Sequence, residues 1–264
     1  MSRIFITGSS EGLGLMAGQL LASQGHSVVL HARNPDRAEV ASRALPQAEA
    51  IINGDVSTIS GARDVAALAN MVGPFDAVIH NVGVGYREKN RIETVDGLPH
   101  VFAINVIAPY VLTALMGKPT RLVYLSSGMH RFTGAHLDDI KWLTREWDGA
   151  QAYSESKLYN VLFAFAISRL WPDVRVNALE PGWVPTRMGG PEAPDDLRQA
   201  HLTQAWLAAS DAPEACVTGE YFYHKRRRAP NPVAYHTATQ DRLLTLCEEI
   251  TGISINETSD RELA

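Results

Sequence analysis

Tyr153 and Lys157 have residue types and a spacing that could do chemistry. They lie four residues apart, and this spacing places two side chains on one face of a helix. A lysine ammonium close to a tyrosine favours the phenolate and lowers the pKa of the phenol. The pair therefore predicts a tyrosine that acts as a general acid or base on an oxygen atom.

A glycine-rich segment follows the first apolar run of the chain and opens a segment of helical periodicity. It consists of Thr7, Gly8, Ser9, Ser10, Glu11, Gly12, Leu13 and Gly14. Glycines permit a tight turn and a close backbone approach to a pyrophosphate, and a helix N-terminus offers unpaired N–H groups to the anion. The segment predicts a dinucleotide-binding turn.

The end of the second apolar run bears on the choice of dinucleotide. It reads His31, Ala32, Arg33, Asn34, without the carboxylate that usually hydrogen-bonds the ribose of NAD. Arg33 can pair with the 2'-phosphate of NADP, so NADP(H) is favoured over NAD(H). Two points argue against this preference. Glu11 would repel that phosphate if it pointed inward, and Arg33 could instead be a solvated surface residue.

Short β-rich runs alternate with segments of helical periodicity, which is typical of βαβ units. Strands are expected at residues 3–7, 27–31, 50–52, 76–80, 121–126, 174–179 and 220–223, and helices at 13–24, 37–44, 59–71, 99–116, 153–170 and 239–250. We expect an α/β fold: a single doubly wound Rossmann domain over residues 1–264, with an about seven-stranded, mostly parallel sheet and helices on both faces. Its ligands should bind at the carboxyl ends of the strands.

Composition excludes several other classes of protein. A net charge of −5 gives no general attraction to nucleic acid or anionic lipid. The basic run at residues 225–228 could be a polyanion patch but is interpreted as a solvated turn. No signal peptide is visible, no apolar stretch approaches the roughly 20 residues that span a bilayer, and two cysteines make no disulfide framework. We expect a cytoplasmic protein without membrane insertion.

The two motifs, TGxxxGxG at residues 7–14 and YxxxK at residues 153–157, together resemble the short-chain dehydrogenase/reductase family. Further matches follow in chain order over almost the whole chain: Asp55, Asn81 with Gly83, Asn105, Ser127, and Pro181 with Gly182. The interval between Ser127 and Tyr153 and the C-terminal residues 221–253 look like the retinol-dehydrogenase-like branch, which does not settle the substrate.

The resemblance implies roles for individual residues. Ser127, rather than its neighbour Ser126, would hydrogen-bond the substrate oxygen, and Lys157 would also reach the nicotinamide ribose. Asn105 would hold a water that links Lys157 to solvent, although it could instead satisfy the backbone of a kinked helix. The catalytic set is Ser127, Tyr153, Lys157 and Asn105, and the cofactor-binding set is Gly8, Ser9, Ser10, Glu11, Gly12, Leu13, Gly14, Arg33, Asp55, Val56, Asn81, Val82, Gly83, Tyr153, Lys157, Pro181, Gly182, Val184 and Thr186.

Some residues depart from the family pattern or suggest other sites. His80 and Val82 stand where the family usually has Asn and Ala, and His80 is interpreted as a buried histidine without chemistry. Four residues, His130, His136, Asp138 and Asp139, match no familiar metal-ligand spacing, so no metal is expected.

Residues 183–212 are expected to form a mobile lid over an apolar substrate, with Trp183, Met188 and Trp206 either in the lid or in the core. In the family, the helices that hold Asn105 and Tyr153 commonly pair across a two-fold axis, so a homo-oligomer is one expectation. The apolar residues of the second helix could equally be used up against the sheet.

The sequence thus predicts an NADP(H)-dependent oxidoreductase that transfers a hydride between nicotinamide and a small-molecule carbonyl or alcohol. The branch that modifies nucleotide sugars would prefer GxxGxxG in the first turn, which is absent here. An alternative is a catalytically silent dinucleotide-sensing regulator on the same fold. The presence of all four catalytic residues argues against that alternative.

Overall fold

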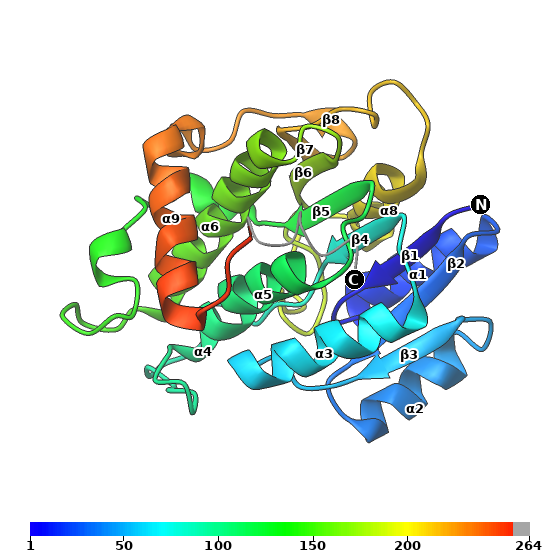
Figure 1. Cartoon of the computed structure of the whole chain (residues 1–264), viewed down its shortest axis with the longest axis horizontal. Coiled ribbons are helices and arrows are strands. Elements are labelled where there is room, and N and C mark those ends of the chain that lie inside the picture. Colours follow the sequence, from blue (N-terminus) through cyan, green and yellow to red (C-terminus); the bar gives the residue numbers. More distant parts are fainter. Residues whose placement is uncertain (256–264) are drawn as a thin grey trace, which may run out of the picture.

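The computed structural model describes residues 1–255 and is built on one eight-stranded sheet with the strand order β3-β2-β1-β4-β5-β6-β7-β8 (Figure 1). Neighbouring strands from β3 to β7 pair in parallel, and β8 pairs antiparallel with β7. The strands are β1 Arg3–Ile6, β2 Ser27–Ala32, β3 Ala50–Asn53, β4 Ala77–His80, β5 Arg121–Leu125, β6 Arg175–Glu180, β7 Glu220–Tyr223 and β8 Arg226–Arg227.

The doubly wound topology is confirmed. The chain runs outward from β1 to β3 and then returns to place β4 on the other side of β1, so the strand order reverses between β1 and β4. Such a reversal opens a crevice at the carboxyl ends of the strands. The expected seven strands are all present, and β8 is an addition: the basic run turns at His224 and Lys225, then adds two residues to the sheet edge.

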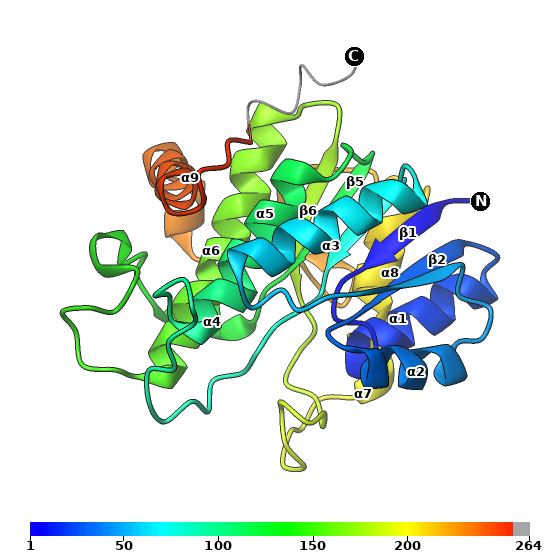
Figure 2. The same cartoon turned by 60° about the horizontal axis from the view of Figure 1, so that its bottom comes forward.

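Helices cover both faces of the sheet (Figures 1 and 2). Successive strand side chains point to opposite faces, so Phe5 packs in the core with α3, α5, α6 and α9, whereas Ile4 and Ile6 pack in the core with α1 and α8. The α-helices are α1 Gly12–Ser23, α2 Pro35–Ala44, α3 Ile59–Val72, α4 His100–Phe102, α5 Ala108–Leu115, α6 Gly149–Leu170, α7 Leu197–Ala200, α8 Leu202–Ala209 and α9 Thr237–Thr251.

Two helices differ from expectation for local reasons. Helix α6 starts four residues earlier than expected, because the Asp148 side chain accepts from the N–H groups of Ala150 and Gln151 and caps the first turn. The helix expected at 99–116 is broken by a π-helical turn at Ala103–Ile107. Pro109 cannot donate an N–H to the carbonyl of Asn105, which explains the wider turn there.

The segment expected as a lid, residues 183–212, consists of two parts with different structures, a connection at residues 183–196 and a helical part that includes α8. Helix α8 buries Ala205, Leu207 and Ala208 in the core beside the sheet, and Trp206 meets Phe222 edge-on at 5.6 Å between ring centres. The part that could move is therefore the connection at residues 183–196. Among residues 1–255, no helix is long and apolar enough to cross a membrane.

The excursion between β5 and α6 is anchored by a buried ion pair. The Arg145 guanidinium donates to both carboxylate oxygens of Glu155, at 2.7 and 3.1 Å, and Glu155 is only 1% exposed. Arg145 also contacts Asp139 at 3.3 Å and lies over the Trp142 ring at 3.9 Å. Glu155 therefore depends on Arg145 for most of its charge compensation.

We predict that Arg145→Ala lowers the free energy of unfolding by about 3 kcal/mol, because it leaves a buried carboxylate without its cation. Urea denaturation followed by circular dichroism measures this change. The control is Arg198→Ala, since Arg198 and Asp196 form an exposed, solvent-screened pair whose loss should change the free energy of unfolding little. Equal losses in the two variants would contradict the structural role given to Glu155.

Candidate active site

The expected catalytic side chains meet at the carboxyl end of β5. Tyr153 and Lys157 both lie on α6 and are buried, with the Lys157 ammonium 5.6 Å from the centre of the Tyr153 ring. Ser127, two residues beyond the end of β5, lies close enough to the Tyr153 hydroxyl to lower its pKa by hydrogen bonding. Ser126 points elsewhere and donates to the carbonyl of Lys157 at 2.8 Å. Of the two serines, Ser127 is the one placed to reach an oxygen atom bound beside Tyr153.

Burial controls the charge of this pair. It raises the pKa of Tyr153 to about 12, against the opposing effect of the hydrogen bond from Ser127, and Tyr86 raises it further. It also lowers the pKa of Lys157 to about 8. The direction for Tyr153 is opposite to the one expected from a neighbouring lysine, because loss of solvent disfavours the phenolate and is the largest effect on this pKa. At neutral pH Tyr153 keeps its proton and can donate it.

Asn105 ties the π-helical turn to its neighbours. Its Oδ1 accepts from the N–H of Val84 at 2.8 Å, and its Nδ2 donates to the carbonyl of Val84 and to Ser156 Oγ at 3.1 and 3.0 Å. A Cβ added to Gly83 would lie 3.2 Å from Lys157 Nζ and 3.3 Å from Asn105 Oδ1. The Asn105 side chain thus bonds the backbone of Val84, after β4, and the side chain of Ser156 on α6. None of these bonds joins it to the backbone of its own helix, and it also lies close to Lys157.

The glycine-rich turn fits an anion. Its first glycine, Gly8, has a φ of +60°, and a Cβ added there would lie 2.8 Å from Val82 Cα. Within residues 1–255, the backbone N–H groups of residues 10–14 have no hydrogen-bond partner, and the N-cap residue Glu11 makes no capping bond to α1. Nothing lies within 4 Å of a Cβ built on Gly12. These free donors around an open space suit the pyrophosphate of a dinucleotide.

Charges near the end of β2 are arranged to offset Glu11. The Glu11 carboxylate pairs with Arg37 at 2.6 Å and lies 3.8 Å from Arg187. Arg33 is exposed, and no ion pair to it occurs in the part of the chain that the structure describes. The negative charge of Glu11 is therefore offset by Arg37 and Arg187.

The remaining cofactor-binding candidates line the same edge. Asp55 accepts from the N–H of Ser57 at 2.9 Å, and Val56 is buried. The Asn81 amide donates to the carbonyls of Thr7 and Gly8, which joins the end of β4 to the turn. After β6, Gly182 has a φ of +90°, Val184 is buried, and Thr186 Oγ1 accepts from the N–H of Gly189.

Two residues next to Tyr153 were not anticipated from the sequence. The Tyr86 ring meets the Tyr153 ring at 5.7 Å, and Arg87 lies over Tyr86 at 5.4 Å. Both side chains reach the carbonyl of Gly189, and Met188 Sδ lies 3.9 Å from the Tyr153 hydroxyl. The sequence signal that could have indicated this contact is the aromatic residue Tyr86, which follows shortly after Gly83. Residues 86–87 and 188–189 thus close over Tyr153.

His80 lies in the core. Its Nε2 is 3.0 Å from Thr113 Oγ1, its ring packs on Tyr124, and burial lowers its pKa to about 3, so it is neutral. None of these contacts joins the His80 side chain to a candidate catalytic residue. Over residues 1–255, no three His, Cys, Asp or Glu side chains gather as metal ligands.

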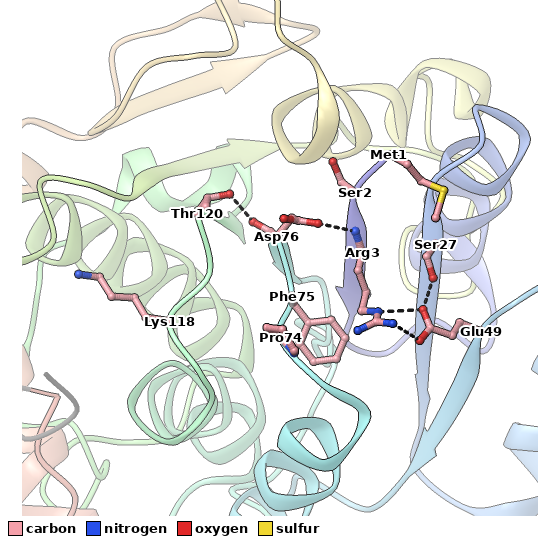
Figure 3. A pocket seen from close by; sticks show the side chains of 10 residues that line it. All are labelled: Met1, Ser2, Arg3, Ser27, Glu49, Pro74, Phe75, Asp76, Lys118 and Thr120. Carbon is pink, nitrogen blue, oxygen red and sulfur yellow. Dashed lines mark hydrogen bonds and ion pairs between the residues drawn. The ribbon is translucent and has the colours of Figure 1, made fainter. Parts of the chain in front are cut away.

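Two hollows in the surface lie away from Tyr153. One of about 520 Å³ is at the opposite, amino edge of the sheet (Figure 3), where Arg3 pairs with Glu49 and its N–H donates to Asp76. Of its charged side chains, Arg3 and Glu49 pair with each other, Asp76 accepts from the N–H of Arg3, and Lys118 pairs with Asp173 outside the hollow. The other, of about 560 Å³, is lined by Gln199, Tyr223, His224 and the three arginines 226–228 at the β8 edge. Neither contains a candidate catalytic residue.

Comparison with known proteins identifies the family. A model of the short chain dehydrogenase family matches residues 2–129. An uncharacterised oxidoreductase of Emericella nidulans is 42% identical over 97% of this chain and 99% of its own length. The chain belongs to the short-chain dehydrogenase/reductase family. Human retinol dehydrogenase 13 is 27% identical over 98% of this chain and 87% of its own length, which supports the retinol-dehydrogenase-like branch.

Solved structures of similar fold agree. An uncharacterised protein from Mycobacterium paratuberculosis superposes with a TM-score of 0.83, 24% identity, and coverage of 97% of this chain and 95% of that one. A blue fluorescent protein from a metagenomic library, solved in complex with NADPH, has a TM-score of 0.67 and 20% identity over 84% of this chain and 95% of that one. As a short-chain dehydrogenase/reductase, the protein is an oxidoreductase that acts on CH–OH or carbonyl groups.

We predict that the stability of the protein rises with pH between about 8 and 10.5 through Lys157, whose pKa is about 8 in the folded chain and 10.5 ordinarily. The unfolded chain binds more protons in this window, so raising the pH favours the folded state by up to about 3 kcal/mol. Urea denaturation at several pH values should show this gain relative to Lys157→Met. Lys118→Met, at an exposed lysine, is the control for loss of charge alone. A constant difference between wild type and Lys157→Met across the window would refute the prediction.

Proposed function

We propose that this protein is an NADP(H)-dependent oxidoreductase that transfers a hydride between nicotinamide and a small-molecule carbonyl or alcohol, with Tyr153 as the general acid or base. The observation that carries this proposal is the meeting of Ser127, Tyr153 and Lys157 at the sheet edge that also holds the free amides of residues 10–14. The candidate catalytic and anion-binding groups thus lie at the same edge of the sheet.

In the reductive direction, the bound cofactor supplies a hydride to the carbonyl carbon. Tyr153 donates its phenolic proton to the carbonyl oxygen, which leaves a phenolate, and Ser127 donates a hydrogen bond to the same oxygen. The Lys157 ammonium stabilises the phenolate until a proton returns from solvent. Asn105 would hold a water on that route, and the position of its Oδ1 beside Gly83 and Lys157 supports this role.

The proposed preference for NADP(H) rests on charge. Glu11 was the residue that could repel a 2'-phosphate, and its pairing with Arg37 and Arg187 supports the view that it does not. Arg33 is exposed and available for a bidentate contact with the phosphate.

Substrate entry requires movement at residues 183–196, which we propose to be the lid. Met188 occupies the space in front of the Tyr153 hydroxyl, where the substrate oxygen would have to lie. Trp183, half exposed in the same connection, holds the closed form through its Nε1–H bond to the carbonyl of Gly189.

The first test measures loss of the absorbance of NADPH with a panel of aldehydes, ketones and quinones. We expect turnover on at least one class and a fall in kcat of about a thousandfold or more in Tyr153→Phe, which removes the proton donor and leaves the ring in place. Met188→Ala is the matched control, since it changes the surroundings of the hydroxyl without removing it. NADPH binding without turnover on any compound would favour a dinucleotide-sensing regulator instead.

The second test addresses the cofactor. Arg33→Ala should raise the KM for NADPH about tenfold or more and leave the KM for NADH unchanged, because a charge-assisted hydrogen bond is worth about 1.5–3 kcal/mol. Arg43→Ala, at an exposed arginine of α2, the helix that follows Arg33, controls for general loss of positive charge. Parallel increases for both cofactors would remove Arg33 from the 2'-phosphate site.

A further inference from the structure

His31, the fifth residue of β2, is a buried histidine at the cofactor edge for which the proposed chemistry has no use. It is 1% exposed and lies next to Ala32 and Arg33 at the end of the strand. Four hydrogen bonds join this single residue to two loops. A histidine in that position needs an explanation, since an aliphatic residue would pack in a strand equally well.

The side-chain bonds of His31 run to two different loops. Its Nδ1 accepts from the N–H of Gly8 at 3.0 Å, and its Nε2 lies 2.9 Å from the carbonyl of Gly54. Gly8 opens the glycine-rich turn, and Gly54 directly precedes Asp55. The imidazole therefore spans the gap between the pyrophosphate and adenosine sides of the candidate cofactor site.

The backbone of His31 holds the next residue of the turn. Its N–H donates to Ser9 Oγ at 2.9 Å, and its carbonyl accepts from the N–H of Ser9 at 3.0 Å. The N–H groups of Gly8 and Ser9 are thus both committed to His31. The free amides begin only at residue 10, so His31 sets where the anion-binding part of the turn starts.

These partners fix one protonation state of the ring. A backbone N–H can only donate and a carbonyl can only accept, so Nδ1 must be bare and Nε2 must carry the proton. Burial lowers the pKa of His31 and keeps the ring neutral, although the hydrogen bond to Gly54 and the charge of Asp55 act in the opposite direction. The Phe5 ring, edge-on at 6.4 Å, adds no charge.

We propose that His31 is a positioning residue for cofactor binding: its neutral ring holds the Gly8 amide and the Gly54 carbonyl so that the turn presents its free N–H groups at the correct place. This inference rests on the proposed binding of a dinucleotide and adds a residue outside the motif that controls its affinity. Its effect should fall on the binding of the cofactor and not on proton transfer, because Tyr153 and Ser127 are held by α6 and β5.

Two conservative variants separate the two side-chain bonds. His31→Asn can place an oxygen near the position of Nδ1 and keep the bond from Gly8, whereas His31→Gln can place an amide nitrogen near the position of Nε2 and keep only the bond to Gly54. His31→Leu loses both. The matched control is His80→Gln, at a second buried histidine of the same sheet whose ring bonds to Thr113 and not to the turn.

The experiment measures the Kd of NADPH from the fluorescence of the reduced nicotinamide, together with the melting temperature and kcat at saturating NADPH. We expect the Kd to rise roughly tenfold in the Gln and Leu variants and to stay within about twofold in the Asn variant, with kcat unchanged. His80→Gln should lower the melting temperature and leave the Kd unchanged.

Three results would overturn the inference: equal Kd values in all variants, equal losses in the Asn and Gln variants, or a loss in His80→Gln that follows its melting temperature. If the Leu variant does not fold, the comparison of Asn with Gln still decides. Failure of the wild-type protein to bind NADPH would instead overturn the proposed function, so the two failures are distinguishable.

Discussion

The site depends on a hydrogen-bonded joint between the ends of β1 and β4. Backbone groups just beyond paired strands have no ladder partners, and burying them unpaired is costly. Thr7 Oγ1 accepts from the N–H groups of Asn81 and Val82, and Asn81 Nδ2 donates to the carbonyls of Thr7 and Gly8, all at 2.9–3.0 Å. These side chains replace the missing ladder. They fix the glycine-rich turn relative to residues 82–88, whose Tyr86 contacts Tyr153. The candidate cofactor-binding and catalytic residues are therefore held in a fixed position relative to one another.

Burying Tyr153 and Lys157 lowers the stability of the folded chain, and contacts in the rest of the fold offset this loss. An ammonium removed from water destabilises the folded chain unless it gains polar partners, and within residues 1–255 Lys157 donates only to the carbonyl of Leu125, at 3.1 Å. Asn160 donates to the same carbonyl, which leaves it little capacity for more. The resulting low pKa of Lys157 and high pKa of Tyr153 both disfavour charge at rest. A site of this kind gains stabilisation when a ligand supplies the missing polar contacts.

Sequence patterns predicted the parts of the fold that depend on local chemistry. Apolar runs gave the seven parallel strands, and glycine and YxxxK spacing gave the residues of the crevice. Effects that depend on tertiary distance were not accessible: the pairing of Glu11 with Arg37, which are 26 residues apart, the contact of Tyr86 with Tyr153, and the burial that raises the pKa of Tyr153. The π-helical turn at Asn105 was only partly accessible, because Pro109 signals a defect but not its form.

Helix α6 shows why one expectation about assembly does not transfer simply. Its apolar residues Tyr159, Leu162, Phe163 and Phe165 are all buried within a single chain, and α9 packs along it (Figure 1). Phe165 meets Tyr235 at 5.3 Å, and on another side Glu155 binds the excursion that holds Arg145. A second copy could pair through this helix only by displacing contacts that the chain already makes. The helix that carries Tyr153 and Lys157 is therefore packed within its own chain along residues 152–167, which is the alternative in which its apolar residues are buried in the chain's own core.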